Sequence, residues 1–329
     1  MAQTRRTFLA AAAALLATPY AGAQQPGNKT QVGALSLYTP EIDAHLAKAL
    51  KQRLAALGWI EGQTITYTFR YANNQPARLP ELASELFESP VSVIFAGGDL
   101  PTQALKKAGG KTPVVFAVVN NPVEQGIVES LARPGGTITG MATLGAVAAP
   151  LATKRLELLK EAVPGTMHVG VLMNRTRFFD AFVATLAEAA KSLGLGTTIY
   201  EVNSAADIEG AFASMATANT QTGFVGQGQL LWKERKLIGA LAKQHKIAFV
   251  GSGVEYAEVG CLLAYNVSYV AQVERAAEMI DKILRGASPA DIPVELPDRF
   301  NLVVSARVAR DLGIAIPPSI LLRATRIIE

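Results

Sequence analysis

The sequence has few of the residues that carry covalent or metal chemistry. Only one cysteine, Cys261, is present among 329 residues, which excludes an internal disulfide bond. The three histidines, His45, His168 and His245, lie far apart and lack the spacing of a zinc site or an acid–base pair. Gly-x-Ser-x-Gly, His-Glu-x-x-His and the full Gly-x-x-x-x-Gly-Lys-Ser/Thr phosphate-binding loop are absent as well. We therefore expect no enzyme activity, no cofactor and no metal.

The charge pattern excludes a nucleic-acid partner. The formal net charge is +4, and without Arg5 and Arg6 the chain has 29 basic and 27 acidic residues. Basic residues are interspersed with acidic ones and form no cluster, as nucleic-acid binding would require. The apolar neighbours of Cys261 predict a buried structural thiol in a strand, and no nearby basic residue supports a reactive one.

The first 23 residues are typical of an export signal. Arg5 and Arg6 precede an apolar core at Phe8–Leu16, and the small residues Ala21–Ala23 form a cleavage site. Thr4–Leu9 also fits the twin-arginine pattern, so twin-arginine export and general secretion both stay open. No cysteine follows the cleavage site and no later apolar run could span a bilayer, so we expect a periplasmic protein that begins near Gln24.

Strand and helix patterns alternate along the rest of the chain, which is typical of an α/β fold with parallel sheets. The first run has candidate helices at 41–57, 77–87 and 100–107, and five candidate strands. The predicted strands are Val32–Leu37, Thr64–Tyr71, Val91–Ala96, Val114–Val118 and Ile138–Met141.

A second run of strands and helices begins near Pro150 and has the same order. Its helix from Phe178 places Phe178, Phe182 and Leu186 on one face, the period of a helix with one buried side. The segment Thr143–Pro150 between the runs is short and apolar, which predicts a hinge. The predicted strands of the second run are Val169–Met173, Thr198–Val202, Gly223–Val225 and Ala248–Val250.

The segment Val118–Gly140 carries a resemblance to a known family. It contains Asn-Pro-Val and then Ser-Leu-Ala-Arg-Pro-Gly-Gly-Thr-Ile-Thr-Gly, and a short helix is expected after Asn-Asn-Pro. A second match near the end contains Ile292–Pro297, Phe300–Val304 and Ile316–Ser319. The chain resembles, from about Gln31 to Glu329, the family of ABC-transporter substrate-binding proteins that includes the tryptophan- and tyrosine-binding proteins.

The resemblance implies a type I periplasmic binding protein, with two Rossmann-like lobes that have parallel-sheet cores and are hinged by three crossovers. We expect crossings near Thr143–Pro150, Tyr265–Tyr269 and Pro289–Pro297. Lobe 1 then contains residues 30–145 plus 267–290, and lobe 2 contains residues 146–266 plus 291–329. A leftover strand, Cys261–Asn266, leads the chain back to lobe 1, and strands at Pro293–Leu296 and Phe300–Val304 follow the last long helix.

Polar residues that follow the predicted strands are the candidate ligand contacts, because ligands bind at the carboxyl ends of strands in such sheets. Asp99 is also explained as a helix cap, and Phe178 as a core residue. Lobes whose loops face one another form a cleft, the usual place for a ligand. The candidates are Tyr38, Thr39, Asp99, Thr102, Asn120 and Asn121 from lobe 1, Asn174, Phe178, Gln227 and Glu255 from lobe 2, and Asn266 near a crossing.

The sequence departs from the family pattern at two of these places. Asn121 replaces the Asp that usually precedes Pro-Val, and Gly226–Gly228 replaces the Thr-Asp-Asn of amino-acid-binding members. A zwitterionic ligand needs an anionic partner for its ammonium group, because a buried unpaired charge is costly. The remaining acidic candidates are Glu255, Asp99 and Asp180.

Three functions fit these features to different degrees. The leading hypothesis is a monomeric periplasmic solute-binding protein that closes on a small molecule, such as an amino acid or a related polar or aromatic solute, and delivers it to an ABC permease in the inner membrane. A ligand-sensing subunit for a membrane receptor is the alternative. An exported α/β hydrolase is the third, and it lacks a visible nucleophile–base pair.

Overall fold

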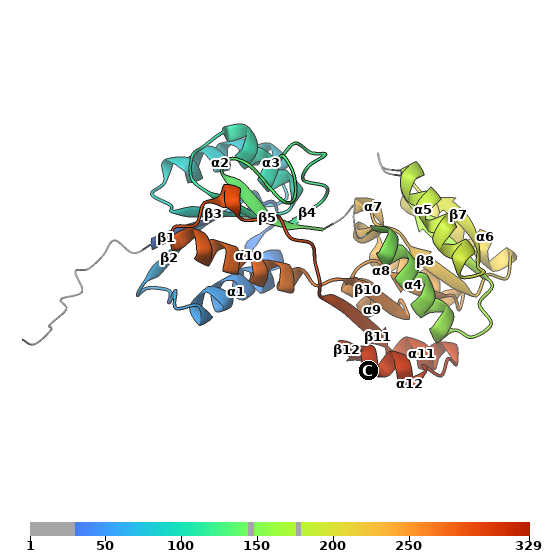
Figure 1. Cartoon of the computed structure of the whole chain (residues 1–329). Coiled ribbons are helices and arrows are strands. Elements are labelled where there is room, and N and C mark those ends of the chain that lie inside the picture. The colour runs from blue at the N-terminus through green and yellow to red at the C-terminus, as the bar shows by residue number, and fades with distance from the viewer. Residues whose placement is uncertain (1–29, 144–147, 176–178) are drawn as a thin grey trace, which may run out of the picture.

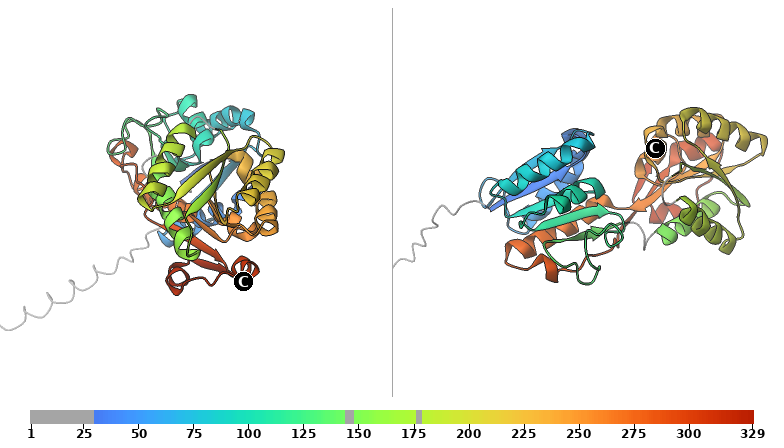
Figure 2. Two further views of the ribbon diagram at one scale, coloured as in Figure 1. Left: turned by 90° about the vertical axis from the view of Figure 1, so that its right-hand side faces the viewer. Right: turned by 90° about the horizontal axis from the view of Figure 1, so that it is seen from above.

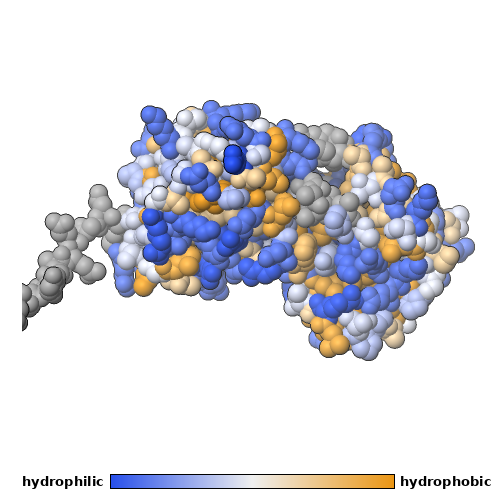
Figure 3. All heavy atoms as spheres, viewed as in Figure 1, coloured by the Kyte–Doolittle hydropathy of each residue, from blue (hydrophilic) through white to orange (hydrophobic). Residues whose placement is uncertain are grey.

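The chain folds into two α/β lobes that lie side by side and are joined by a narrow connection, as Figures 1 and 2 show. This computed structural model describes residues 30–143, 148–175 and 179–329. The signal segment and Phe178 lie outside the described residues. Hydrophilic residues cover most of the face of both lobes shown in Figure 3, with small hydrophobic patches between them.

The first sheet is fully parallel, in the order β2-β1-β3-β4-β5. Strands β3, β4 and β5 are short, mostly buried runs because helices cover both faces of the sheet, whereas the edge strand β2 is only partly buried. Helices α2 and α3 cover one face, and α1 covers the other together with the distant helix α10 (Tyr269–Leu284). The elements are β1 (Thr30–Ser36), α1 (Pro40–Ala56), β2 (Ile65–Tyr71), α2 (Leu79–Glu88), β3 (Val93–Gly97), α3 (Asp99–Ala108), β4 (Val114–Val119) and β5 (Ile138–Ala142), with a 3-10 turn η1 (Pro76–Arg78).

The second sheet repeats this topology and extends it. The order β7-β6-β8-β9-β10 reproduces that of the first sheet, and β11 and β12 follow at the edge. Strand β11 is antiparallel to β10 and parallel to β12. The elements are α4 (Ala148–Ala162), β6 (His168–Met173), α5 (Phe179–Ser192), β7 (Gly196–Glu201), α6 (Ala205–Thr217), β8 (Thr222–Val225), α7 (Gln229–Lys233), α8 (Arg235–Gln244), β9 (Ala248–Gly251), α9 (Val254–Val259), β10 (Leu263–Val267), β11 (Phe300–Ser305), α11 (Ala306–Leu312), α12 (Pro318–Arg323) and β12 (Arg326–Ile328).

The α/β class and the two parallel-sheet cores predicted from the sequence are confirmed, and so is the prediction that the two runs share one topology. Helix α10 (Tyr269–Leu284) follows β10 of the second sheet but packs on the first sheet. It is amphipathic, and its apolar face buries Val273, Ala277 and Ile280 with β3 and β4. The chain therefore passes between the sheets before α4, before α10 and again before β11.

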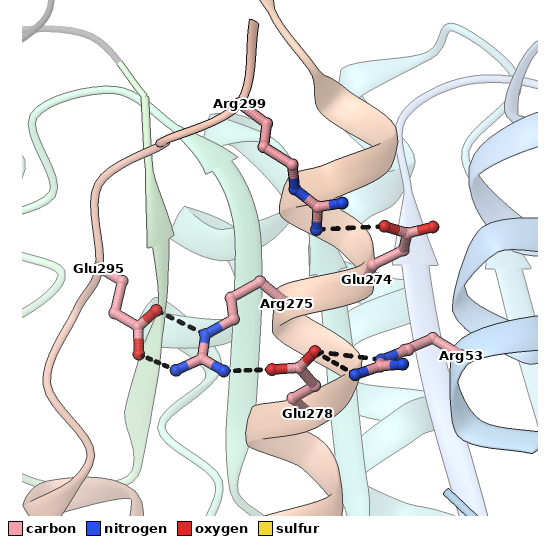
Figure 4. Close-up of polar contacts among 6 residues, drawn as sticks. All are labelled: Arg53, Glu274, Arg275, Glu278, Glu295 and Arg299. Atoms are coloured by element: carbon pink, nitrogen blue, oxygen red, sulfur yellow. Dashed lines mark hydrogen bonds and ion pairs between the residues drawn. The ribbon is translucent and has the colours of Figure 1, made fainter. Parts of the chain in front are cut away.

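Ion pairs attach the last connection to the first lobe, as Figure 4 shows. Arg275 on α10 binds both carboxylate oxygens of Glu295, with N–O distances of 2.6 and 2.7 Å, and it also pairs with Glu278. Glu278 in turn accepts from Arg53 on α1. Ile292 and Val294 are buried among first-lobe residues, so contact with that lobe extends past the predicted boundary at residue 291. The chain then leaves the lobe after Glu295.

Local predictions failed where the chain has no continuous hydrogen-bond ladder. Residues 122–129 form a series of turns, not the expected short helix. The expected strand at Pro293–Leu296 is reduced to a single bridge between Glu295 and Met141. Cys261 is fully buried as predicted but precedes β10, so it does not lie within the strand. Burial raises the pKa of the Cys261 thiol to about 12, which makes it unreactive at neutral pH.

A glycine contact between α8 and the end of α9 provides a test of the second lobe. A Cβ added at Gly239 would lie 2.0 Å from the carbonyl oxygen of Val259, whereas one added at Gly210 in α6 would meet nothing within 4 Å. We expect Gly239→Ala to lower the free energy of unfolding by about 2–3 kcal/mol, since backbone must move. Gly210→Ala should raise it by about 0.5–1 kcal/mol, because alanine favours the helix. Urea denaturation checks both, and equal stability of the two variants would contradict the contact.

Candidate ligand cavity

A cavity of about 270 Å³ lies where the strand order of the first sheet reverses, between β1 and β3. Such a switch point is the usual ligand site of an open α/β sheet, because loops leave it in opposite directions. The floor comes from the ends of β1, β3 and β4, and the walls come from α1 and the start of α10. The lining residues are Ala34, Leu35, Ser36, Tyr38, Asp43, Leu46, Ala47, Leu50, Phe69, Tyr71, Phe95, Gly97, Gly98, Asp99, Ala117, Val118, Asn120, Tyr269 and Val273.

Asp99 and Asn120 form the polar end of this cavity. The Asp99 carboxylate accepts the Asn120 backbone N–H at 2.8 Å, its Nδ2 at 2.6 Å and Gln125 Nε2 at 2.8 Å. These bonds fix the loop after β4 to the start of α3, which Gly98 makes possible with a φ of 92°. The buried Asn120 Oδ1 has no partner among the described residues, so it can accept a hydrogen bond from a bound molecule.

The backbone beside Asn120 is strained. Val118 has a φ of 61° at a bulge in β4, and a β-branched residue rarely adopts this conformation. Such strain persists only where the surrounding structure enforces it, and it clusters at binding sites. Asn121 also has a positive φ, 44°, which asparagine tolerates better. Its Nδ2 donates to Glu124 at 2.9 Å, and Asn121 does not line the cavity.

The other first-lobe candidates are Tyr38, Thr39 and Thr102, and only Tyr38 lines the cavity. Tyr38 lines the cavity and is 42% exposed, and burial is the main cause that raises the pKa of its hydroxyl. Thr39 caps α1 with its backbone and lies outside the lining. Thr102, expected to face the cleft, is fully buried, and its hydroxyl donates to the Gly98 carbonyl at 2.7 Å. Its position on α3 turns the side chain inward.

In the second lobe, Asn174 and Gln227 follow β6 and β8, the strands that flank the equivalent switch point. The two loops lie close together, since a Cβ added at Gly228 would fall 1.6 Å from Asn174 Oδ1. That buried oxygen has no partner among the described residues. Glu255 lies in the first turn of α9 and is partly exposed, whereas Asp180 points into solvent with a side chain 90% exposed. Asp180 is therefore unsuited to pair with a buried ligand charge.

A buried arginine connects this lobe to the crossing before α10. Arg155 on α4 is 1% exposed, and its Nε donates to the Tyr265 carbonyl at 2.7 Å. Its Nη2 reaches the Ser252 carbonyl and Asn266 Oδ1 at 3.4 and 3.5 Å. Arg155 forms no ion pair with any residue that the structure describes. Burial lowers its pKa to about 10, so it stays charged at neutral pH and makes the end of β10 electropositive.

Asn266 connects Arg155 to the cavity. Its Nδ2 donates to the Tyr269 hydroxyl at 3.2 Å, and Tyr269 forms part of the cavity wall. The cavity of the first lobe and the strand ends of the second lobe thus share one hydrogen-bonded chain of side chains. Within residues 30–143, 148–175 and 179–329 we find no group of three acidic, histidine or cysteine side chains that could hold a metal ion.

Sequence reasoning missed three residues of this arrangement. Asp43 and Tyr269 line the cavity from helices, not from the loops that follow strands. Arg155 lies in a helix whose charges look like those of a solvated face. Asp43 and Tyr269 could have been assigned to the cavity only from the helical period of α1 and α10 together with the strand order.

The paired sheets, the three connections and a cavity at a switch point define a two-lobe binding protein. In agreement with this architecture, the sequence profile described as "ABC transporter substrate binding protein" matches residues 39–328. The chain belongs to the family of ABC transporter substrate-binding proteins.

Individual relatives agree with this assignment. The chain is 25% identical over 264 residues to a tyrosine-binding protein from Clostridioides difficile (strain R20291), covering 79% of this chain and 75% of the relative. It shares the fold of a ligand-free, open substrate-binding protein with adhesive properties from Clostridium difficile (TM-score 0.79, 23% identity, 91% and 99% of the two chains covered). A similar match is an ABC domain in complex with L-Trp from Streptococcus pneumonia (TM-score 0.75, 22% identity, 92% and 100% covered).

Arg155 and its partly exposed neighbour Lys154 offer a matched pair of substitutions. We expect Arg155→Met to lower the free energy of unfolding by about 1–3 kcal/mol, because buried carbonyl acceptors lose their donor. Lys154→Met removes only a partly exposed pair with Glu157 and should change stability by less than about 0.5 kcal/mol. Thermal or urea denaturation measures both. Wild-type stability in Arg155→Met would show that the cost of burying the guanidinium cancels its hydrogen bonds.

Proposed function

We propose that the protein is the solute-binding component of an ABC-type import system and has no enzymatic activity. It binds an amino acid or a related small polar or aromatic solute between its lobes and delivers it to a membrane permease. The observation that carries the proposal is the switch-point cavity, whose wall residue Tyr269 is hydrogen-bonded to Asn266 of the other lobe. Motion of one lobe relative to the other would therefore act directly on the cavity.

The relatives support the choice of ligand class. A tyrosine-binding protein and a protein crystallised with L-Trp share the family or the fold of this chain. In the cavity described here, aromatic side chains line the walls and polar groups lie at one end, the usual composition of a small-molecule site. Tyr38, Asp99, Asn120 and Asn266 are the sequence candidates that we retain for this site. Asn174, Gln227 and Glu255 remain candidates on the facing lobe.

The proposal is tested with a solute panel of amino acids, purines and small carboxylates. A ligand present at 100 times its Kd should stabilise the protein by about 2.7 kcal/mol and raise its melting temperature. Small-angle X-ray scattering should show a smaller radius of gyration with that ligand, as lobe closure requires. Deleting the gene should abolish uptake of the same solute. Binding and closure with normal uptake in the deletion strain would favour the sensing role and contradict transport.

Export is a separate part of the proposal. We expect a periplasmic protein cleaved after Ala23, since Ala21–Ala23 follow an apolar core and no cysteine comes next. None of the helices described in the structure is long and apolar enough to cross a membrane. Mass spectrometry of the protein from its native host should find Gln24 as the first residue. A retained Met1 or a lipid adduct would contradict this expectation.

A further inference from the structure

The charged groups of the cavity are all of one sign. Among the described residues that line it, Asp43 and Asp99 are the only carboxylates, and none is a lysine, arginine or histidine. The Asp99 carboxylate is occupied by three N–H donors from the loop after β4. The Asp43 carboxylate, by contrast, accepts only one hydrogen bond from a described side chain, the hydroxyl of Ser36. That hydroxyl, which also accepts the backbone N–H of Tyr38, is neutral and therefore supplies no counter-charge to the carboxylate.

Asp43 carries its charge in apolar surroundings. Phe69, Tyr71 and Phe95 line the same cavity, and the rings of Phe69 and Tyr71 are stacked with centroids 5.9 Å apart. Asp43 forms no ion pair with any described residue. Burial raises the pKa of its carboxyl and outweighs the Ser36 hydrogen bond and the nearby His45, both of which lower it.

We infer that Asp43 is the specificity-determining residue of this cavity and that it pairs with a protonated primary amine of the solute. The inference rests on the proposed solute-binding function of the same site. An ammonium group would supply the missing counter-charge and would lie against aromatic faces, which attract cations. The free Asn120 Oδ1 would accept one of its N–H groups.

An anionic or neutral end of a solute fits this place less well. A carboxylate would lie beside Asp43 and Asp99 and would be repelled by both. A neutral group would leave the half-buried Asp43 carboxylate unpaired, so its partial desolvation would remain uncompensated. Arg155, which donates to the Tyr265 carbonyl just before the crossing, belongs to the second lobe and favours negative charge there. The amine end of the solute is therefore assigned to the first lobe.

Two matched sets of probes test this assignment by calorimetry. The first set is L-tyrosine, tyramine and 3-(4-hydroxyphenyl)propionate, and the second is L-leucine, 3-methylbutylamine and 4-methylpentanoate. Within each set the skeleton is constant, and the acid lacks the amine. In the set that binds, the amine-bearing probes should bind at least ten-fold more tightly than the acid, a difference of about 1.4 kcal/mol.

The Asp43→Asn variant provides the second arm. Asparagine keeps an acceptor for Ser36, so the fold is retained, and removal of a desolvated charge should leave the melting temperature equal or higher. Its affinity for the amine-bearing probes should fall at least ten-fold, with no loss for the acid. Glu81→Gln is the control, since Glu81 is an exposed carboxylate on α2, on the other face of the sheet. It should bind every probe as the wild type does.

Each outcome decides between the two proposals. Three results would overturn the role of Asp43 and leave solute binding intact. The acid could bind as tightly as its amine, Asp43→Asn could keep the wild-type affinity, or the tightest ligand of the panel could lack a basic nitrogen. Asp43→Asn with a lowered melting temperature and unchanged affinity would assign it a structural role only. Binding of no solute in the panel or the sets would contradict the proposed function, and the role of Asp43 with it.

Discussion

The docking of α10 on the first sheet is the constraint on which the two-lobe arrangement depends. By chain order this helix lies between β10 and β11 of the second sheet, yet its apolar face is buried against β3 and β4. Burial of that face is worth about 25 cal/mol per Å², whereas two short connections cost little closure entropy. The chain must therefore leave the second lobe and return to it. The ion pairs of Arg275 with Glu278 and Glu295 then hold the returning segment on the first lobe.

The same helix brings the two halves of the site together. Tyr269 and Val273, at its first two turns, complete the cavity that β1, β3 and β4 begin. Because α10 starts directly after β10, Tyr269 remains within hydrogen-bond reach of Asn266, and Asn266 is in reach of Arg155. A wall of the cavity is thus continuous with the strand ends of the opposite lobe. Any rotation at the crossing before α10 changes the geometry of this series of hydrogen-bonded side chains.

Site residues that follow strands could be predicted from the sequence, whereas the direction of side chains on helices could not. The rule that ligands bind after strands selected Tyr38, Asp99 and Asn120, which line the cavity. The same rule selected Thr102, which faces the core because α3 turns it inward. Asp43 escaped notice because a carboxylate in the first turn of a helix is usually explained by the helix dipole. Its position in the cavity depends on the packing of α1 beside α10, which is a long-range contact.

Opposite charges that form no ion pair with a described residue lie on the two lobes, Asp43 in the cavity of the first and Arg155 beside the end of β10 in the second. This arrangement suits the proposed closure on a ligand. The Arg155 guanidinium is held by carbonyl and amide oxygens, and the Asp43 carboxylate is held by a hydroxyl. The closure proposed above would remove more water from the half-buried Asp43 carboxylate, whereas the Arg155 guanidinium is already buried. A desolvated charge with no partner would destabilise the closed state. On the proposed function, a solute of complementary charge would compensate this penalty, and one without it would not. The strain at Val118 and the oxygens of Asn120 and Asn174 that lack a described partner also raise the free energy of the state without ligand. Contacts with a bound solute would offset these costs.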